Sequence, residues 1–119
     1  MIKRMRGDSP PGRSQSSSYQ DLVWTVATAS DETLDLRDQT VQALRTLEDS
    51  LIELGSDKTR IISAQVFIAN IANKPVMDQV WNDWIGSNPD HWPQRACLGV
   101  SLGGNWLIEI TAVAVKHSL

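Results

Sequence analysis

The segment that decides the fold runs from residue 94 to residue 114 and reads QRACLGVSLGGNWLIEITAVA. Two apolar stretches flank the dipeptide Gly103-Gly104, which is typical of a tight turn that needs positive φ. The sequence therefore predicts two strands paired as a β-hairpin. Arg95 and Glu109 stand among aliphatic residues. Because burying an unpaired charge is costly, we expect each of them to have a partner or a function.

The composition is that of an ordinary globular domain. The chain has 119 residues, of which 41% are hydrophobic and 21% are charged, so it is too apolar for a disordered protein. The formal net charge is -3, whereas nucleic-acid-binding domains usually carry a basic stripe or patch. We therefore expect no nucleic-acid partner.

The sequence shows no pattern typical of a disulfide, a metal site or a membrane-spanning segment. The single cysteine excludes an intramolecular disulfide, and neither histidine has a partner at the spacing of a metal pair. No apolar run approaches the length that crosses a bilayer, and the basic start of the chain is not followed by the apolar core of a signal peptide. We expect a cytoplasmic protein that uses no metal, no cofactor and no membrane.

The main elements predicted in the first half of the chain are a buried strand and a long helix. The chain up to about Ser18 is rich in Ser, Pro and Gly, and residues 1–11 are expected to be a flexible N-terminus, followed by a single domain over residues 12–119. The apolar stretch 19–28 predicts a buried strand. Apolar residues then recur at three- and four-residue intervals between residues 36 and 54, which predicts an amphipathic helix. Asp31, Thr33 or Asp35 can cap this helix, and Gly55 can end it.

The second half repeats this order and ends in the predicted hairpin. Residues 59–71 are apolar at both alternating sets of positions, which is typical of a central strand. Asn73 is placed to cap a second helix with Pro75 in its first turn, and Gly86 can end it. With a short extra strand near residues 13–18, the elements predict an α+β fold in which two helices pack on one face of a mixed sheet. The uncovered face is expected to meet other subunits in a closed symmetric oligomer.

This order of elements and the C-terminal segment resemble the Rid family of YjgF-like or RidA-like reactive intermediate deaminases. The residues that carry the resemblance are Pro93, Arg95, Cys97, Leu98, Ile108, Glu109 and Ile110. The resemblance implies a chorismate-mutase-like fold assembled as a homotrimer, with pockets at the subunit interfaces. It also implies hydrolysis of reactive 2-enamino and 2-imino acids to 2-keto acids and ammonia.

The chemistry of such substrates assigns a role to each polar residue of the segment. A guanidinium binds a carboxylate through two parallel hydrogen bonds, so Arg95 is the expected anchor for a small carboxylate-bearing ligand. Glu109 is the expected group that orients a water molecule and moves protons. Cys97 is expected to form a wall of the pocket, because a free cysteine usually packs as a small hydrophobe. The alternative is that Arg95 and Glu109 pair with each other or with groups of neighbouring subunits.

The opposite wall of the expected pocket departs from the family pattern. Deaminase-active members carry a Ser-Gly pair where this chain has Val26 and Ala27, so a substrate-binding hydroxyl is lost. Arg13 falls near the position of a pocket tyrosine, and beside Arg95 it would make the pocket more cationic and select a larger or more acidic ligand. The expected substrate-binding residues are therefore Arg95, Cys97, Arg13, Val26 and Ala27.

Three functions are consistent with the sequence. The first is an imine or enamine deaminase that uses Arg95 and Glu109 as catalytic residues. The second is a non-catalytic or differently specific trimer that binds a small carboxylate metabolite, which the residues at positions 26 and 27 favour. The third is a ribonuclease, which is disfavoured by the acidic charge and by the lack of a basic, aromatic surface.

Overall fold

Six strands form one mixed sheet in the computed structural model, which describes residues 1–117. The strands are β1 (Lys3–Met5), β2 (Ser16–Tyr19), β3 (Leu22–Thr28), β4 (Ile61–Ile68), β5 (Gln94–Gly99) and β6 (Ile108–Val115). Their order across the sheet is β1-β2-β3-β6-β4-β5. Neighbours run antiparallel except β4 and β5, which are parallel.

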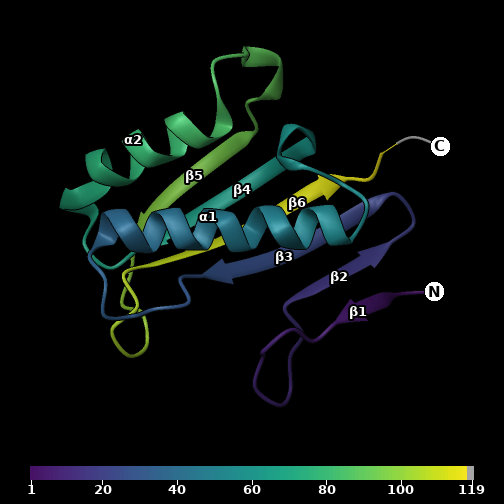
Figure 1. Cartoon of the computed structure of the whole chain (residues 1–119), viewed down its shortest axis with the longest axis horizontal. Helices are drawn as coiled ribbons and strands as arrows, with labels where there is room; N and C mark the ends of the chain where they lie inside the picture. The colour runs from purple at the N-terminus through teal and green to yellow at the C-terminus, as the bar shows by residue number, and fades with distance from the viewer. Residues whose placement is uncertain (118–119) are drawn as a thin grey trace.

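Two helices cover one face of this sheet (Figure 1). Helix α1 spans Leu36–Glu53, and Asp35 caps it by accepting a hydrogen bond from the backbone N–H of Asp38 at 2.9 Å. Helix α2 spans Lys74–Ile85, with Pro75 in its first turn and Gly86 at its C-terminal end. The predicted α+β fold, with a mixed sheet and both helices on one side, is confirmed.

The predicted C-terminal hairpin is wrong. Strand β4 lies between β5 and β6, so these two strands do not pair with each other. The glycines still form a turn, in which Gly104 has φ +58° and Trp106 donates to the carbonyl of Gly103. That turn belongs to a connection that crosses the end of β4. Since β6 buries alternate apolar residues from Ile108 to Ala114, it gains more from two neighbouring strands than β5, which takes the edge.

The N-terminal residues also differ from the expectation. Lys3–Met5 forms the edge strand β1, which pairs with residues 16–18 of β2. The turn between these strands is fastened by Arg6, whose guanidinium donates hydrogen bonds to the carbonyls of Ser9 and Arg13. Part of the stretch expected to be a flexible terminus is therefore built into the sheet.

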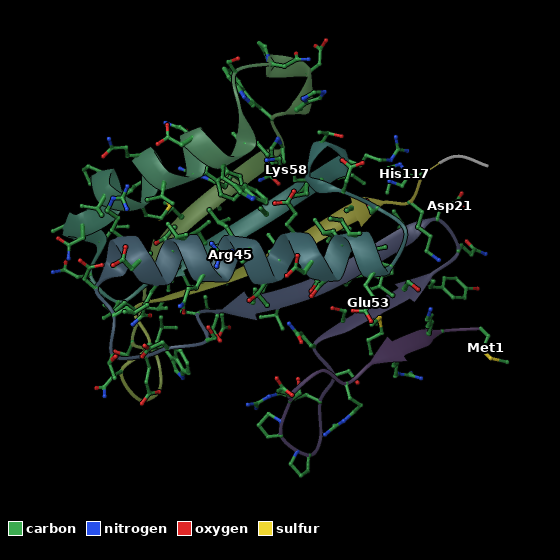
Figure 2. All side chains as sticks on the ribbon, in the orientation of Figure 1. Met1, Asp21, Arg45, Glu53, Lys58 and His117 are labelled. Atoms are coloured by element: carbon green, nitrogen blue, oxygen red, sulfur yellow. The ribbon has the colours of Figure 1, made fainter. Side chains whose placement is uncertain are left out.

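The hydrophobic core lies between the sheet and the helices. The larger apolar side chains that are fully buried there are Val23, Leu44, Leu47, Leu51, Val66, Ile68, Met77, Ile108 and Ile110. Polar residues of α1 such as Arg45 are exposed on the side of the helix away from the sheet (Figure 2). This arrangement leaves the second face of the sheet without a helix. Trp24 and Leu98 are exposed on that face, and Glu109 and Thr111 are half-buried there.

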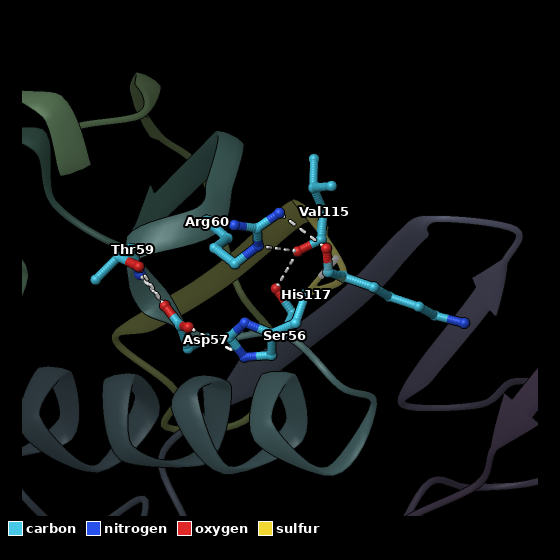
Figure 3. Close-up of polar contacts among 7 residues, drawn as sticks. Ser56, Asp57, Thr59, Arg60, Val115 and His117 are labelled. Carbon is cyan, nitrogen blue, oxygen red and sulfur yellow. Dashed lines mark hydrogen bonds and ion pairs between the residues drawn. The ribbon is translucent and has the colours of Figure 1, made fainter. Parts of the chain in front are cut away.

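A polar clamp fastens the end of β6 to the loop between α1 and β4 (Figure 3). Ser56 and Arg60 donate hydrogen bonds to the carbonyl of Val115 at 2.6 and 3.1 Å. Asp57 accepts hydrogen bonds from the backbone N–H and the hydroxyl of Thr59, and its other oxygen lies 3.2 Å from His117 Nε2. Burial opposes the ionisation of Asp57, but these hydrogen bonds and the charges of His117 and Arg60 outweigh it and lower its pKa.

The clamp predicts a pH-dependent contribution to stability. Because the folded-state pKa of Asp57 lies below its ordinary value of 3.8, the ionised carboxylate stabilises the fold above that pH, and this contribution is lost as the pH falls further. Asp57→Asn should therefore lower the free energy of unfolding at about pH 6, and the difference from wild type should shrink towards about pH 3. Urea unfolding at both pH values measures it. A constant difference would contradict the role of the charge.

Candidate functional site

Arg95 lies on the helix-covered side of the sheet, at the edge strand β5. In the parallel register it stands beside Ala64 of β4, which is buried under the helices. Its Nη2 is 2.6 Å from Oδ1 of Asp78 on α2, and its guanidinium lies 5.2 Å from the centre of the Trp81 ring. The Arg95 side chain is only 18% exposed. These contacts hold the guanidinium in one position between α2 and β5.

Asp78 joins two cations. Its Oδ1 accepts the hydrogen bond from Arg95, and its Oδ2 accepts one from Nζ of Lys74 at 2.8 Å, one turn earlier on α2. Burial raises the pKa of Asp78, but the hydrogen bonds and positive charges of Lys74 and Arg95 have the larger combined effect, so its pKa is lowered. Asp78 is therefore a carboxylate at neutral pH. Arg95 is bound to it by one nitrogen, not by both arms of the guanidinium fork.

A cleft of about 760 Å³ opens beside this ion pair. Its walls come from the second half of α2, from the following loop and from the start of β5. Trp92 is held there by a hydrogen bond from its indole N–H to the carbonyl of Gly86 at 2.8 Å. The lining side chains that bear on function are Asp78, Trp81, Asp83, Trp92 and Arg95. The cleft thus combines one guanidinium, two carboxylates and two indole rings.

Cys97 lies on the same side of the sheet as Arg95 but packs against the core. It stands beside Val66 in the parallel register and is half-buried. Burial raises the pKa of its thiol, and the nearby charge of Arg95 only partly offsets this effect. A neutral thiol is a poor nucleophile. The residue is suited to packing below the site.

Glu109 lies on the opposite face of the sheet from Arg95. It is flanked by Ile108 and Ile110, which are buried on the helix side, so strand alternation directs its side chain to the uncovered face. Its neighbours across the sheet are Thr28 and Phe67. The strands β5 and β6 do not pair with each other, and within one chain Arg95 and Glu109 lie on opposite faces of the sheet.

The residues of the other expected wall are divided in the same way. Arg13 and Val26 line a hollow of about 830 Å³ on the uncovered face, together with Arg4, Arg6 and Trp24. Ala27 points the other way and is buried in the core. Arg13 was expected beside Arg95, but within one chain the two arginines lie on different faces of the sheet. Each face carries part of the expected site.

The partner of Arg95 was not evident from the sequence. Asp78 belongs to a helix whose polar residues look like an ordinary solvated face, and Trp81, which lies over the guanidinium, is buried in the core. The signal that could have found Asp78 is topological. In a strand–helix–strand unit with parallel strands, the helix packs back over the sheet, so a charge on α2 lies above the start of β5.

Two negative findings concern residues 1–117. Within this range no group of three or more His, Cys, Asp or Glu side chains is arranged to hold a metal ion. No helix in this range is both long enough and apolar enough to cross a membrane.

Sequence comparisons identify the relatives of this chain. Residues 25–116 match the family model described as Endoribonuclease L-PSP. A RutC family protein from Haemophilus ducreyi is 35% identical over 90 residues, which cover 74% of this chain and 75% of that protein. Another RutC family protein, from Haemophilus influenzae, is 27% identical over 106 residues, covering 85% and 88%.

Solved structures with the same fold are found in several bacteria. An uncharacterized protein from Pseudomonas aeruginosa superposes with a TM-score of 0.86 at 26% identity, covering 98% of this chain and 100% of that one. A member of the YjgF protein family from Neisseria meningitidis superposes with a TM-score of 0.89 at 24% identity, covering 100% and 98%. A mixed six-stranded sheet covered on one side by two helices is therefore a YjgF-type fold.

The chain belongs to the YjgF/Rid family, whose family model carries the description Endoribonuclease L-PSP. The resemblance that the residues between Pro93 and Ile110 suggested is thereby confirmed.

Proposed function

We propose that this protein is an imine or enamine deaminase that hydrolyses 2-imino or 2-enamino acids to 2-keto acids and ammonia, in sites formed between the subunits of a homotrimer. The observation that carries the proposal is the position of Arg95. Its guanidinium is held rigidly at the wall of an open cleft, beside Trp81 and Trp92. A preorganised guanidinium next to apolar rings is suited to a small apolar ligand with one carboxylate.

Arg95 retains the donors that such a ligand needs. Its contact with Asp78 uses Nη2, while Nη1 lies 3.7 Å from the sulfur of Met77, which is a weak acceptor. A ligand carboxylate is a stronger acceptor than a thioether and can take this place. The charge and the planar fork of arginine would fix the ligand through its carboxylate and leave its C=N carbon open to attack.

Hydrolysis needs little from the protein beyond a positioned water and a group that moves protons. An iminium C=NH₂⁺ adds the oxygen of one water molecule at carbon, and the C–N bond then breaks to give C=O and NH₄⁺. Glu109 is the carboxylate proposed for the proton transfers. Since it lies on the opposite face from Arg95 within one chain, the site requires Glu109 from a neighbouring subunit.

The uncovered face of the sheet supports an assembly of this kind. It carries the exposed side chains of Trp24 and Leu98, and Val26 is half-buried on it. An apolar face of this kind usually meets another protein surface. The Rid resemblance implies a homotrimer, and closed threefold symmetry would give three equivalent sites, each of which takes Arg95 from one subunit and Glu109 from the next.

A second candidate function is the binding of a small carboxylate metabolite without turnover. Val26 and Ala27 favour it, because neither supplies a hydroxyl and Ala27 is buried in the core. In this case Arg95 would bind the ligand and Glu109 would have no catalytic role.

One assay separates the two candidates. An amino-acid oxidase generates 2-imino acids in the presence of semicarbazide, which traps them as absorbing semicarbazones. A deaminase removes the imino acid first, so the initial rate of semicarbazone formation should fall as the protein is added. An unchanged rate at excess protein, combined with measurable binding of a 2-keto acid by calorimetry, would exclude the deaminase and support the binder.

A further inference from the structure

Asp78 is the charged group that any ligand of Arg95 must meet. Its Oδ1 is 2.6 Å from Arg95 Nη2, and both side chains line the cleft. A ligand carboxylate that binds Arg95 is therefore brought against a second carboxylate. The pair is partly buried, with 18% and 29% of the two side chains exposed, so solvent screens this repulsion less than it would at the surface.

Lys74 does not remove this repulsion. Its Nζ neutralises Asp78 from the side of Oδ2, one helical turn away from the guanidinium. Lys74 is not among the residues that line the cleft, whereas Asp78 and Asp83 both are. The two acidic side chains and Arg95 give the lining a formal charge of -1. Binding of a ligand carboxylate in such a cleft is electrostatically unfavourable unless the ligand also carries a positive charge.

A positively charged nitrogen on the carbon next to the ligand carboxylate meets this requirement. The nitrogen of a 2-amino or 2-iminio acid lies about 2.5 Å from its carboxylate carbon, by standard bond lengths and angles. Because Asp78 directly contacts the guanidinium, a ligand whose carboxylate binds Arg95 can turn that nitrogen towards Asp78. A 2-keto acid places a carbonyl oxygen at the same point, where two acceptors face each other.

We propose that Asp78 is a specificity-determining residue that selects ligands with a cationic nitrogen next to the carboxylate and disfavours the corresponding 2-keto acids. This inference rests on the proposed binding of a carboxylate by Arg95. In a deaminase it has a direct consequence, since the iminium substrate is a cation at this position and the keto-acid product is not. Asp78 then holds the substrate and promotes release of the product.

The test compares two ligands with the same carbon skeleton, 2-aminobutanoate and 2-oxobutanoate. Isothermal titration calorimetry measures both dissociation constants for each variant. Wild type should bind the amino acid about tenfold more tightly, since a charge-assisted hydrogen bond to a partly buried group has that magnitude. Asp78→Asn should reduce this preference about tenfold, by weakening the amino acid and strengthening the keto acid.

Two further variants make the result specific. Asp83→Asn removes an equal charge from the same cleft, and among the interactions of residues 1–117 Asp83 has no contact with Arg95. This variant should keep the preference for the amino acid within about twofold of the wild-type value. Lys74→Met removes the competing partner of Asp78 Oδ2 and should increase the preference. Lys74→Met also serves if Asp78→Asn does not fold, which thermal unfolding would reveal.

The outcomes distinguish this inference from the proposed function. Suppose that Arg95→Met loses both ligands, so that the carboxylate site is real. If Asp78→Asn then keeps the wild-type preference for the amino acid, Asp78 does not determine specificity and the inference is overturned. Where Asp78→Asn does not fold, an unchanged preference in Lys74→Met has the same meaning. An equal loss of preference in Asp83→Asn would also overturn it. If neither ligand binds wild type, or if Arg95→Met binds both as well as wild type does, the proposed carboxylate site itself fails.

Discussion

Arg95→Ala should lower the rate of imino-acid removal in the semicarbazide assay by on the order of 100-fold. The substrate carboxylate would lose its charged hydrogen-bond partner, and truncating one member of a partly buried charge pair typically costs several kcal/mol of binding free energy. The loss should be seen in kcat/KM, since the guanidinium binds the substrate carboxylate before and during the reaction. Arg95→Lys should retain part of the activity. An ammonium preserves the charge but cannot form the two parallel hydrogen bonds of the fork.

Arg45→Ala is the matched control for this prediction. Arg45 is exposed on α1, on the side away from the sheet, so its removal should leave the rate unchanged. The fold should survive Arg95→Ala because Asp78 keeps its contact with Lys74. Equal rates for Arg95→Ala and wild type would exclude Arg95 from the site.

Gln39→Ala should produce a large loss of stability, about 2–4 kcal/mol in the free energy of unfolding. Gln39 is fully buried at the start of α1. Its Nε2 donates hydrogen bonds to the carbonyls of Leu34 and Asn105, and its Oε1 accepts one from the backbone N–H of Leu107 at 2.9 Å. Truncation would leave these partly buried backbone groups without their partners and would release the loop that leads into β6.

Urea unfolding measures this effect, with Asn82→Ala as the control. Asn82 also carries an amide on a helix, but its side chain is exposed, so the expected change is within about 0.5 kcal/mol. Gln39→Leu, which keeps the volume but not the hydrogen bonds, should be nearly as destabilising as Gln39→Ala. If Gln39→Leu were as stable as wild type, packing and not hydrogen bonding would explain the role of this residue.

The sequence predicted both helices and every strand except β1, because their signals are local. The 3.6-residue period of α1, its Asp35 cap and the proline in the first turn of α2 depend on residues within a few positions of each other. The pairing of β5 and β6 depends instead on which strand occupies the centre of the sheet. Gly103-Gly104 does form the predicted turn. A local turn signal, however, carries no information about β4, which lies between the two strands on either side of that turn.

The candidate site was predictable only in part, for the same reason. Arg95 was conspicuous because a charge among aliphatic residues needs a partner. The partner, Asp78, is 17 residues away on a helix whose other polar residues are solvated, and the β4–α2–β5 crossover brings the two together. The sheet face on which Glu109 lies depends on the register of β6. A β5–β6 hairpin and a sheet with β4 at its centre give β6 different neighbours and therefore different registers. Arg13 was expected beside Arg95 because the family resemblance puts it near the position of a pocket tyrosine, and within one chain the sheet separates the two arginines.

The most direct test of an intersubunit site is a mixed assembly of Arg95→Ala and Glu109→Gln subunits, each of which should be inactive alone in the semicarbazide assay. If Arg95 acts with Glu109 of a neighbouring subunit, co-assembly at equal amounts should restore roughly one quarter of the wild-type sites by random association into closed trimers. If both residues had to come from the same subunit, the mixture would stay as inactive as the separate variants, and that result would contradict the proposed site.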